Sequence, residues 1–317
     1  MTLMSEYNSA GSQTEQTGGV INCRLKPGQV WQDPQGGHRV GLGDAADSEF
    51  VARLVDNTAI ELAIQDPPYN VAMFGRCSVT SYIAWCRRWV ETTMAQLADD
   101  ASLYVWMGAD QKRHFQPLPQ FMIMMAEFDL DSRSLITMRN QRGYGTAKNW
   151  MAVRQELLYY TTGNPPFAVQ YTDIPKILRG YYKTVGGRRT ENLERSRSDC
   201  IRPGNVWVDI QQVFYRMQEN VTTLRAQKPL KAIERIIRAS SQPGEAVLDL
   251  FAHAGTTLLA CERLGRRCFT ADIDPMCVEL TIRRLEHFRH TGFTGWQNSD
   301  PGDGELDDVM SPTDHPA

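Results

Sequence analysis

Residues 246–272, AVLDLFAHAGTTLLACERLGRRCFTAD, carry the strongest indication of the fold. An apolar run over 246–251 precedes a helix-length stretch over 255–264, and Gly265 separates that stretch from a second apolar run over 268–273. The spacing predicts a strand, a helix that ends at the glycine, and another strand. Strands that alternate with helices in this way are typical of a mostly parallel sheet.

The same alternation extends to both sides of this unit. We predict helices over residues 81–97, 121–128, 228–240 and 275–287, and strands over residues 60–65, 102–107, 134–138 and 156–161. Asp274 followed by Pro275 resembles a helix N-cap and the first helical residue. The sequence therefore predicts an α/β fold, with a mostly parallel sheet and helices on both of its faces.

Composition limits the class of protein. The chain has 317 residues, of which 42% are hydrophobic and 22% charged, and this excludes a collagen-like, coiled-coil or wholly disordered protein. No apolar run is long enough to span a membrane, and residues 1–19 lack the pattern of a secretory signal. The seven cysteines include no Cys-x-x-Cys pair, so we expect reduced thiols in a cytoplasmic protein without a metal site.

Three segments differ in composition from the rest. Residues 1–20 are polar and residues 293–317 are acidic, and we expect both to be disordered tails. Residues 165–222 have few apolar runs and many Gly, Arg and Tyr, which is typical of an insertion. The expected division places two halves of one domain, 21–164 and 223–292, on either side of this insertion.

The first chemical motif is Asp66-Pro67-Pro68-Tyr69, directly after the strand predicted over 60–65. The prolines hold the backbone at the carboxyl end of the strand and leave carbonyl oxygens without partners, and ligands of open α/β sheets bind at that edge. A carboxylate, a free carbonyl and an aromatic ring suit a planar group that bears an NH2.

The second motif, from Asp249 to Thr257, lies between a predicted strand and a predicted helix. Small residues in such a turn let the backbone approach a ligand, and the start of the helix favours an anionic group. Asp272 follows Asp249 by 23 residues and suits a ribose hydroxyl of a nucleoside cofactor.

Together these motifs resemble those of the β-class S-adenosylmethionine-dependent DNA amino methyltransferases, adenine-N6 type, with the catalytic motif Asp-Pro-Pro-Tyr and the cofactor motif Asp-Pro-Phe-x-Gly-x-Gly-Thr-Thr. The resemblance covers about residues 37–164 and 223–292. It implies a Rossmann-like, mostly parallel seven-stranded sheet in a circularly permuted order, with the catalytic loop first and a target-recognition region inserted over 165–222. Leu250 and His253 depart from the family pattern.

The resemblance also implies roles for individual residues. Asp66 and the carbonyl of Pro67 would hold the target amine, Tyr69 would stack on the base, and Pro68 completes the catalytic loop. S-adenosylmethionine would be bound by Asp44, Asp66, Lys228, Asp249, Phe251, His253, Gly255, Thr256, Thr257 and Asp272. Lys228 would meet the methionine carboxylate, and Asp44 would lie near the adenine edge. His253 places a ring where the family has none; the alternatives for it are an N-cap residue or a packed surface ring.

A basic segment is the candidate for DNA contact. Residues 179–202 hold seven basic and three acidic residues, whereas the whole chain has a net charge of −3. Basic side chains with interleaved Tyr and Gly suit phosphate contact. The candidates here and in a smaller patch near 142–148 are Arg142, Lys148, Arg179, Lys183, Arg188, Arg189, Arg195 and Arg197.

The predicted function is methyl transfer from S-adenosylmethionine to the N6 amine of adenine in double-stranded DNA, after the base has been flipped out of the helix. Adenine is favoured because similar cytosine enzymes often begin the motif with Ser. The alternatives are N4 methylation of cytosine, an amino methyltransferase of RNA or small molecules, an NAD-dependent dehydrogenase, which here lacks Gly-x-Gly-x-x-Gly, and a binding protein without activity. The resemblance implies a homodimer and a bacterial or phage origin, and it leaves open whether a cognate restriction enzyme exists; no membrane partner is expected.

Overall fold

The computed structural model describes residues 22–68, 77–108, 115–144, 147–148, 150–175, 182–191, 198–214, 216–221, 224 and 226–297. The calls on Tyr69, Arg179, Arg195, Arg197 and both predicted tails (apart from residues 293–297) lie outside these residues. Among the described helices, none combines the length and the apolar character that a membrane crossing requires. All seven cysteines are free thiols.

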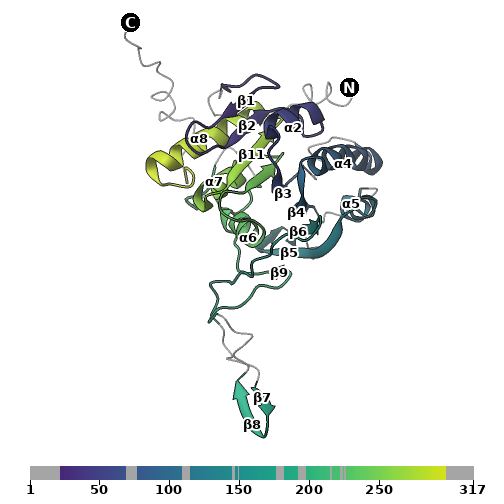
Figure 1. The fold of residues 1–317 in the computed structure, drawn as a ribbon, viewed down its shortest axis with the longest axis vertical. Coiled ribbons are helices and arrows are strands. Elements are labelled where there is room, and N and C mark those ends of the chain that lie inside the picture. Colours follow the sequence, from purple (N-terminus) through teal and green to yellow (C-terminus); the bar gives the residue numbers. More distant parts are fainter. Residues whose placement is uncertain are drawn as a thin grey trace.

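One large sheet forms the centre of the molecule (Figure 1). Its nine strands follow the order β1-β2-β11-β10-β3-β4-β6-β5-β9. Their bounds, in that order, are Val30–Gln32, Arg39–Leu42, Arg267–Asp272, Ala246–Asp249, Ile60–Gln65, Leu97–Met107, Ala152–Thr161, Asp131–Tyr144 and Val206–Trp207. Strands β2, β11, β10, β3 and β4 are mutually parallel, and β6 is antiparallel to both of its neighbours. The predicted mostly parallel α/β sheet is confirmed.

Helices cover both faces of this sheet (Figure 1). One face packs against α6, α7 and α8, and the other against α2, α4 and α5. The bounds of these helices are Leu230–Ser240 (α6), Thr256–Leu264 (α7), Pro275–Thr291 (α8), Ser48–Val55 (α2), Val79–Met94 (α4) and Pro117–Met125 (α5). The strands between these layers are buried on both faces, which is why β3 (IELAIQ) and β10 (AVLD) are mostly apolar.

Local sequence signals located the ends of several helices correctly. Gly265 terminates α7 in the left-handed conformation, at φ 68°. The Asp274 carboxylate caps α8 by accepting the N–H of Met276, and Pro275 is the first residue of the helix. These signals act within one turn of backbone, so they can be read without the tertiary structure.

The sheet has two more strands than the seven that the resemblance implied. The seven-stranded core runs from β2 to β5, and β1 and β9 extend it at opposite edges. Strand β2, together with α2, was not predicted, because glycine interrupts its short apolar run. Gly41 is required there by packing, since a Cβ atom would come within 2.7 Å of the Phe50 ring of α2.

The segment 165–222 divides between a projecting hairpin and the sheet edge. Strands β7 (Tyr182–Val185) and β8 (Arg188–Glu191) form a separate two-stranded sheet, which stands away from the main body (Figure 1). Strand β9 of the same segment instead pairs with β5 in the main sheet. The proposed target-recognition region is therefore partly built into the core fold, and the domain division stays a prediction.

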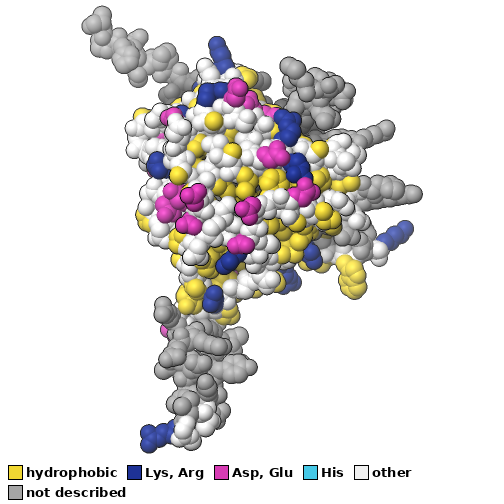
Figure 2. Space-filling model, turned by 45° about the vertical axis from the view of Figure 1, so that its right-hand side comes forward, with side chains coloured by type: hydrophobic (Ala, Val, Ile, Leu, Met, Phe, Trp, Pro, Cys, Tyr) yellow, Lys and Arg dark blue, Asp and Glu magenta, His cyan; other side chains and the backbone are white. Residues whose placement is uncertain are grey.

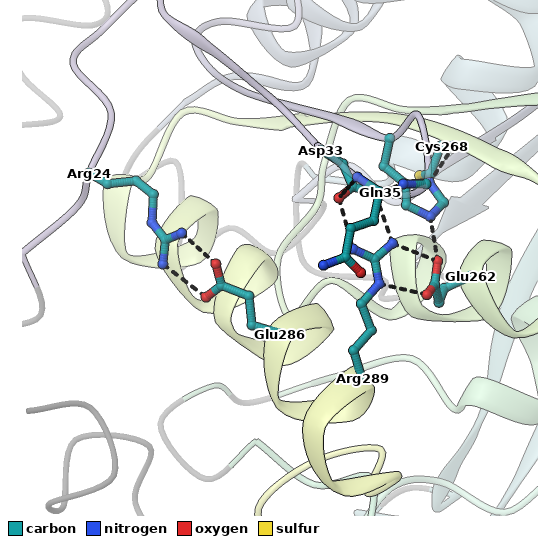
Figure 3. A network of polar contacts seen from close by, with 9 residues as sticks. Arg24, Asp33, Gln35, Glu262, Cys268, Glu286 and Arg289 are labelled. Carbon is teal, nitrogen blue, oxygen red and sulfur yellow. Dashed lines mark hydrogen bonds and ion pairs between the residues drawn. The ribbon is translucent and has the colours of Figure 1, made fainter. Parts of the chain in front are cut away.

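A network of ion pairs fastens the N-terminal segment to α7 and α8 (Figure 3). Arg289 donates two hydrogen bonds of 2.8 Å to the Asp33 carboxylate and two more, of 2.7 and 3.0 Å, to Glu262. His38 accepts the Cys268 N–H at Nδ1 and contacts Glu262 through Nε2, at 2.9 Å. Since Nδ1 acts as an acceptor, Nε2 carries the proton that bridges to Glu262.

Candidate active site

Four carboxylates meet at one edge of the sheet because they follow parallel strands. Asp66 follows β3, Asp249 ends β10, Asp272 ends β11, and Asp44 comes two residues after β2. These four strands are neighbours and point the same way, so their carboxyl ends share an edge. The Gly43 N–H donates to the Asp272 carbonyl at 3.0 Å, which draws the Asp44 loop towards β11.

The Asp66 side chain is held by a lysine from a distant part of the chain. The Lys228 ammonium donates to Asp66 Oδ2 at 2.7 Å, although 162 residues separate the two. Lys228 is 7% exposed and its Nζ lies 5.2 Å from the centre of the Trp106 ring. The second oxygen, Asp66 Oδ1, is buried and has no hydrogen-bond partner in the described part of the chain. One oxygen of this carboxylate is therefore anchored, while the hydrogen-bonding capacity of the other is unused within the described residues.

The turn after β10 places several backbone groups close to these carboxylates. Asp249 Oδ1 accepts the Phe251 N–H at 2.9 Å, and Asp272 Oδ2 accepts the His253 N–H at 2.8 Å. Gly255 caps α7 at φ 69°, with the backbone of Thr281 so close that a Cβ atom would lie 2.9 Å from its Cα. This close packing explains why glycine is needed at position 255.

His253 occupies the turn in a conformation that favours glycine. Its φ is 45°, in the left-handed region, and its side chain is half-buried and lines the pocket beside Asp66. The N-cap of α7 is Gly255, so the alternative of His253 as an N-cap is wrong. The backbone at position 253 is therefore in a conformation that glycine adopts without strain, and the imidazole forms part of the pocket wall.

Burial controls the charge of the site. It raises the pKa of Asp249 to about 7, against hydrogen bonds from Thr257 and the Phe251 N–H that lower it. Burial likewise raises the pKa of Asp272 to about 6, although the N–H groups of Asp274 and His253 favour its ionised form. Burial lowers the pKa of His253. A cationic ligand at this edge would therefore find carboxylates that are costly to ionise without it.

The pocket between Asp66 and the turn is small. It has a volume of about 20 Å³, which is room for about one water molecule. Lys228 and Asp66 both belong to its wall, together with Phe251, Thr256 and Thr257. A nucleoside-sized ligand therefore needs more room than this pocket alone provides. The donor set itself suits such a ligand, since it combines carboxylates for hydroxyl and amine groups with an ammonium for an anionic group.

Two supporting residues were missed by the sequence analysis. Arg284 of α8 is fully buried and donates to the Ala254 carbonyl at 2.7 Å and to Thr256 at 3.1 Å, so it clamps the turn from behind. Gln65 accepts the Leu250 N–H at 3.0 Å and so ties the two motifs together. No local pattern distinguishes these residues, because each acts across the fold on a backbone group that is remote in sequence.

The DNA-contact candidates are only partly described. Arg188 is exposed in the projecting hairpin and Lys148 is exposed near the end of β5, whereas the side chains of Arg142, Lys183 and Arg189 lie outside the described part of the chain. Figure 2 shows charges of both signs scattered over the visible face of the body, and a basic group at the outer end of the hairpin. Their role in DNA contact stays a prediction.

Comparison with known proteins connects this geometry to a family. The model of the N6_N4_Mtase family, described as DNA methylase, matches residues 60–283. The type II methyltransferase M.HpaI of Haemophilus parainfluenzae is 26% identical over 251 residues, which are 78% of this chain and 73% of that protein. The DNA adenine methyltransferase YhdJ of Escherichia coli is 25% identical over 252 residues, or 73% of this chain and 78% of the relative.

Solved structures show the same fold. The PvuII DNA methyltransferase, titled cytosine-N4-specific, superposes with a TM-score of 0.57 at 16% identity, over 82% of this chain and 89% of that one. The M1.HpyAVI–SAM complex gives a TM-score of 0.53 at 16% identity, over 78% of this chain and 98% of the other. At these identities the likeness concerns the fold alone.

Proposed function

The chain belongs to the N6/N4 DNA methylase family, and on that premise we propose that it transfers a methyl group from S-adenosylmethionine to the N6 amine of adenine in double-stranded DNA. The observation that carries the proposal is the state of the Asp66 carboxylate. One of its oxygens is anchored by Lys228, and the other is buried without a hydrogen-bond partner among the described residues. A hydrogen-bond acceptor in that state suits an N–H donor such as the exocyclic amine of a base.

The cofactor would be held along the edge formed by β2, β11 and β10. Asp272 and Asp249 would accept hydrogen bonds from its hydroxyl and amine groups, Asp44 would lie at its adenine edge, and the turn from Phe251 to Thr257 would line its central part. When bound, S-adenosylmethionine supplies a methyl group that is already activated by its sulfonium charge. The chain therefore has to supply alignment and electrostatic stabilisation, not a covalent intermediate.

Asp66 and Pro67 act on the base. A flipped adenine, which costs a few kcal/mol to extrude, would donate its two N–H bonds to the Asp66 carboxylate and the Pro67 carbonyl. Both acceptors favour a nitrogen whose lone pair is directed at the methyl group, and the carboxylate stabilises the positive charge that grows on that nitrogen. We propose that Tyr69 stacks on the base and that Pro68 keeps the loop rigid.

Lys228 serves two sites in this proposal. Its ammonium has three N–H donors and one of them is already directed at Asp66, at 2.7 Å. An ammonium group also suits the carboxylate of the methionine part of the cofactor by charge. Lys228 would thereby couple the two ligands, because the same cation neutralises the cofactor carboxylate and orients the acceptor of the base.

The choice of adenine over cytosine rests on the motif that begins with Asp66. The names of relatives include both an adenine methyltransferase and a cytosine-N4 methyltransferase, so the choice needs an experiment. DNA from cells that express the chain, in a host without methylation of its own, should contain N6-methyladenine by mass spectrometry of the digested nucleosides. N4-methylcytosine alone would overturn the choice of base.

A variant tests the catalytic role. Asp66→Ala should abolish methyl transfer, because the amine loses its acceptor, while binding of S-adenosylmethionine by calorimetry survives. Asp129→Ala is the matched control, since Asp129 is exposed and no ion pair involves it in the described part of the chain. Substantial turnover by Asp66→Ala in a radiolabelled-methyl assay would contradict the mechanism.

The substrate and the partners are part of the same proposal. Family membership excludes the dehydrogenase interpretation. Duplex DNA should accept label in the methyl-transfer assay, and RNA of the same sequence should not; equal labelling of RNA would favour the RNA alternative, and no labelling would favour a binding protein. We propose residues 165–222 as the target-recognition region. Homodimer formation, a cognate restriction enzyme and a cytoplasmic location remain predictions.

A further inference from the structure

A second cavity lies at the opposite edge of the sheet from Asp66. It has a volume of about 340 Å³ and opens between the ends of β5, β6 and α6 and parts of the segment 165–222. The pairing of β4 with β6 shows this separation. Met107, at the end of β4 near the candidate active site, pairs with Glu156. Ser102, five residues earlier, pairs with Thr161, which lines the cavity. Helix α6 contributes to both sites: Ile233 lines the pocket beside Asp66, whereas Arg235, Ile236 and Ala239 line this cavity.

Aromatic rings line this cavity. Tyr104 and Tyr159 are stacked, with centroids 4.2 Å apart and planes at 5°, and both are buried. Phe167 lies 6.2 Å from Tyr159 and is 53% exposed, so one aromatic ring of the wall is open to a ligand. Trp207 is covered by the Arg235 guanidinium, 5.0 Å from its ring centre. The lining therefore suits a planar group that enters beside Phe167.

The charge at the cavity is positive. Its lining includes Arg133, Arg202 and Arg235 and no Asp or Glu. Arg235 is already paired with Asp209, which balances its charge. Arg133 and Arg202 are exposed, and within the part of the chain that the structure describes neither side chain makes an ion pair or a hydrogen bond. Two open guanidinium groups beside an aromatic wall suit a phosphate, which arginine binds through paired N–H donors.

We propose that this cavity binds a nucleotide, with its base against Phe167 and its phosphate between Arg133 and Arg202. The volume lies in the range of sites for small molecules. Amide side chains from Asn164, Gln170 and Asn205 also line the cavity and offer donors and acceptors to the edge of a base. The nucleotide comes either from the free pool or from a DNA strand that passes this edge. The site is independent of the methyl-transfer chemistry.

Calorimetry on the full chain tests the proposal. S-adenosylhomocysteine is added first, so that adenine nucleotides do not enter the donor site. Deoxyadenosine monophosphate and a short single-stranded oligonucleotide are then titrated in separate arms. At least one of them should bind, and for the free nucleotide both deoxyadenosine and deoxyribose 5-phosphate should bind at least about tenfold more weakly, since each lacks one of the two recognised groups.

Surface variants locate the binding. Arg133→Ala and Arg202→Ala should each weaken it about tenfold, as expected for the loss of a charge-assisted hydrogen bond, and Phe167→Ala should weaken it by a similar factor through lost stacking. All three side chains are exposed, so the fold should tolerate their truncation. Arg88→Ala is the matched control, because Arg88 is an exposed arginine of α4 on the other face of the sheet, and it should leave binding unchanged.

The two arms identify the source. If the free nucleotide binds and these variants weaken that binding, the cavity is a separate nucleotide site. If only the oligonucleotide binds and these variants weaken its binding, the cavity takes a nucleotide of a DNA strand. The proposal would be overturned if neither probe bound, or if binding were unchanged in the variants of Arg133, Arg202 and Phe167. It would also be overturned if inorganic phosphate or an acidic peptide bound as tightly as the nucleotide. The methyl-transfer assay is scored separately, so failure here leaves the proposed activity standing.

Discussion

At the scale of single residues, His253 is the clearest departure from the family pattern. An L-residue in the left-handed region costs on the order of 1 kcal/mol, and His253 has a φ of 45°. Its peptide N–H is nevertheless held by Asp272 at 2.8 Å, so the surrounding contacts determine the backbone conformation. The difference from a glycine at this position is therefore the imidazole side chain, which forms part of the pocket wall.

Replacing His253 by glycine should open the pocket. We expect His253→Gly to bind S-adenosylhomocysteine about fivefold more tightly, a gain of about 1 kcal/mol, because the ring no longer narrows a pocket of about 20 Å³. Calorimetry measures the affinity. His253→Ala is the control, since it removes the ring but keeps the conformational penalty, and it should show most of the gain. Weaker binding by both variants would mean that the ring contacts the donor.

The raised pKa values at the site predict a pH dependence. With pKa values of about 7 for Asp249 and about 6 for Asp272, the folded chain keeps protons that the unfolded chain releases near pH 4, so these groups lower the stability as pH rises towards 7. A cationic donor prefers both groups ionised. The affinity of the chain for this donor should therefore fall as the pH is lowered, by up to about tenfold per group for each pH unit below the pKa of that group. Binding should also release protons, because it favours the ionised carboxylates.

Calorimetry in two buffers with different ionisation enthalpies would count the released protons. Asp249→Asn is the informative variant, because its side chain cannot titrate. The donor affinity of this variant should no longer change with pH near pH 7, whereas the change near pH 6 that is due to Asp272 should remain. A donor affinity that is constant from pH 5.5 to 7.5 in the unmodified chain would contradict the assignment.

At the scale of elements, helix α8 is fastened at both of its ends. Near its start, Glu279 is bound by Arg24 at 2.9 Å. Near its end, Arg289 binds Asp33 and Glu262, as Figure 3 shows. Asp33 is buried, and although that burial raises its pKa, hydrogen bonds from Arg289 and from the N–H groups of Gln35 and Gly36 lower the pKa to about 2. Its contribution to stability is present above pH 4 and is lost as the pH falls towards 2.

Removing the Arg289 side chain should weaken the whole fold. Arg289→Ala leaves the buried Asp33 carboxylate without its cation, and the free energy of unfolding should fall by about 3 kcal/mol in urea at pH 7. Arg87→Ala is the matched control, because Arg87 pairs with Glu127 at the surface and its loss should cost less than about 1 kcal/mol. An equal decrease in the free energy of unfolding for the two variants would show that the buried network contributes no more to stability than a surface ion pair.

At the scale of the whole molecule, positive charge is separated from the acidic edge that forms the candidate active site. The hairpin of β7 and β8 carries Lys183, Arg188 and Arg189, and it projects from a body with charges of both signs (Figure 2). A chain with a net charge of −3 can approach DNA if its basic groups are concentrated in this way.

Neutralising the hairpin should weaken DNA binding without affecting the cofactor. The triple variant Lys183→Gln, Arg188→Gln and Arg189→Gln should lower the affinity for duplex DNA and reduce the slope of log K against log salt by about 3, close to one unit per lost phosphate contact. Fluorescence anisotropy at several salt concentrations measures both. A control with Lys26, Arg53 and Arg88 changed to Gln removes equal charge elsewhere. An identical loss in both variants would show that only net charge matters.

The sequence by itself determined the α/β class, most of the central strands and helices, and the two motifs that meet at the active edge. Each of these depends on local features: apolar periodicity, a glycine or proline at a helix end, or a run of consecutive residues such as Asp66-Pro67-Pro68. Strand β2 was not predicted because Gly41 interrupts its apolar pattern, and the reason for that glycine becomes visible only in its packing against the Phe50 ring.

Only the tertiary structure decided which side chains meet. Asp66 pairs with Lys228 across 162 residues, and Arg289 with Asp33 across 256. The same holds for the clamp of Arg284 on the turn at Ala254 and for the arginines beside the second cavity. The physical reason is that contacts between charged side chains depend on the order and direction of the strands that carry them, and a local pattern contains no information about a partner hundreds of residues away.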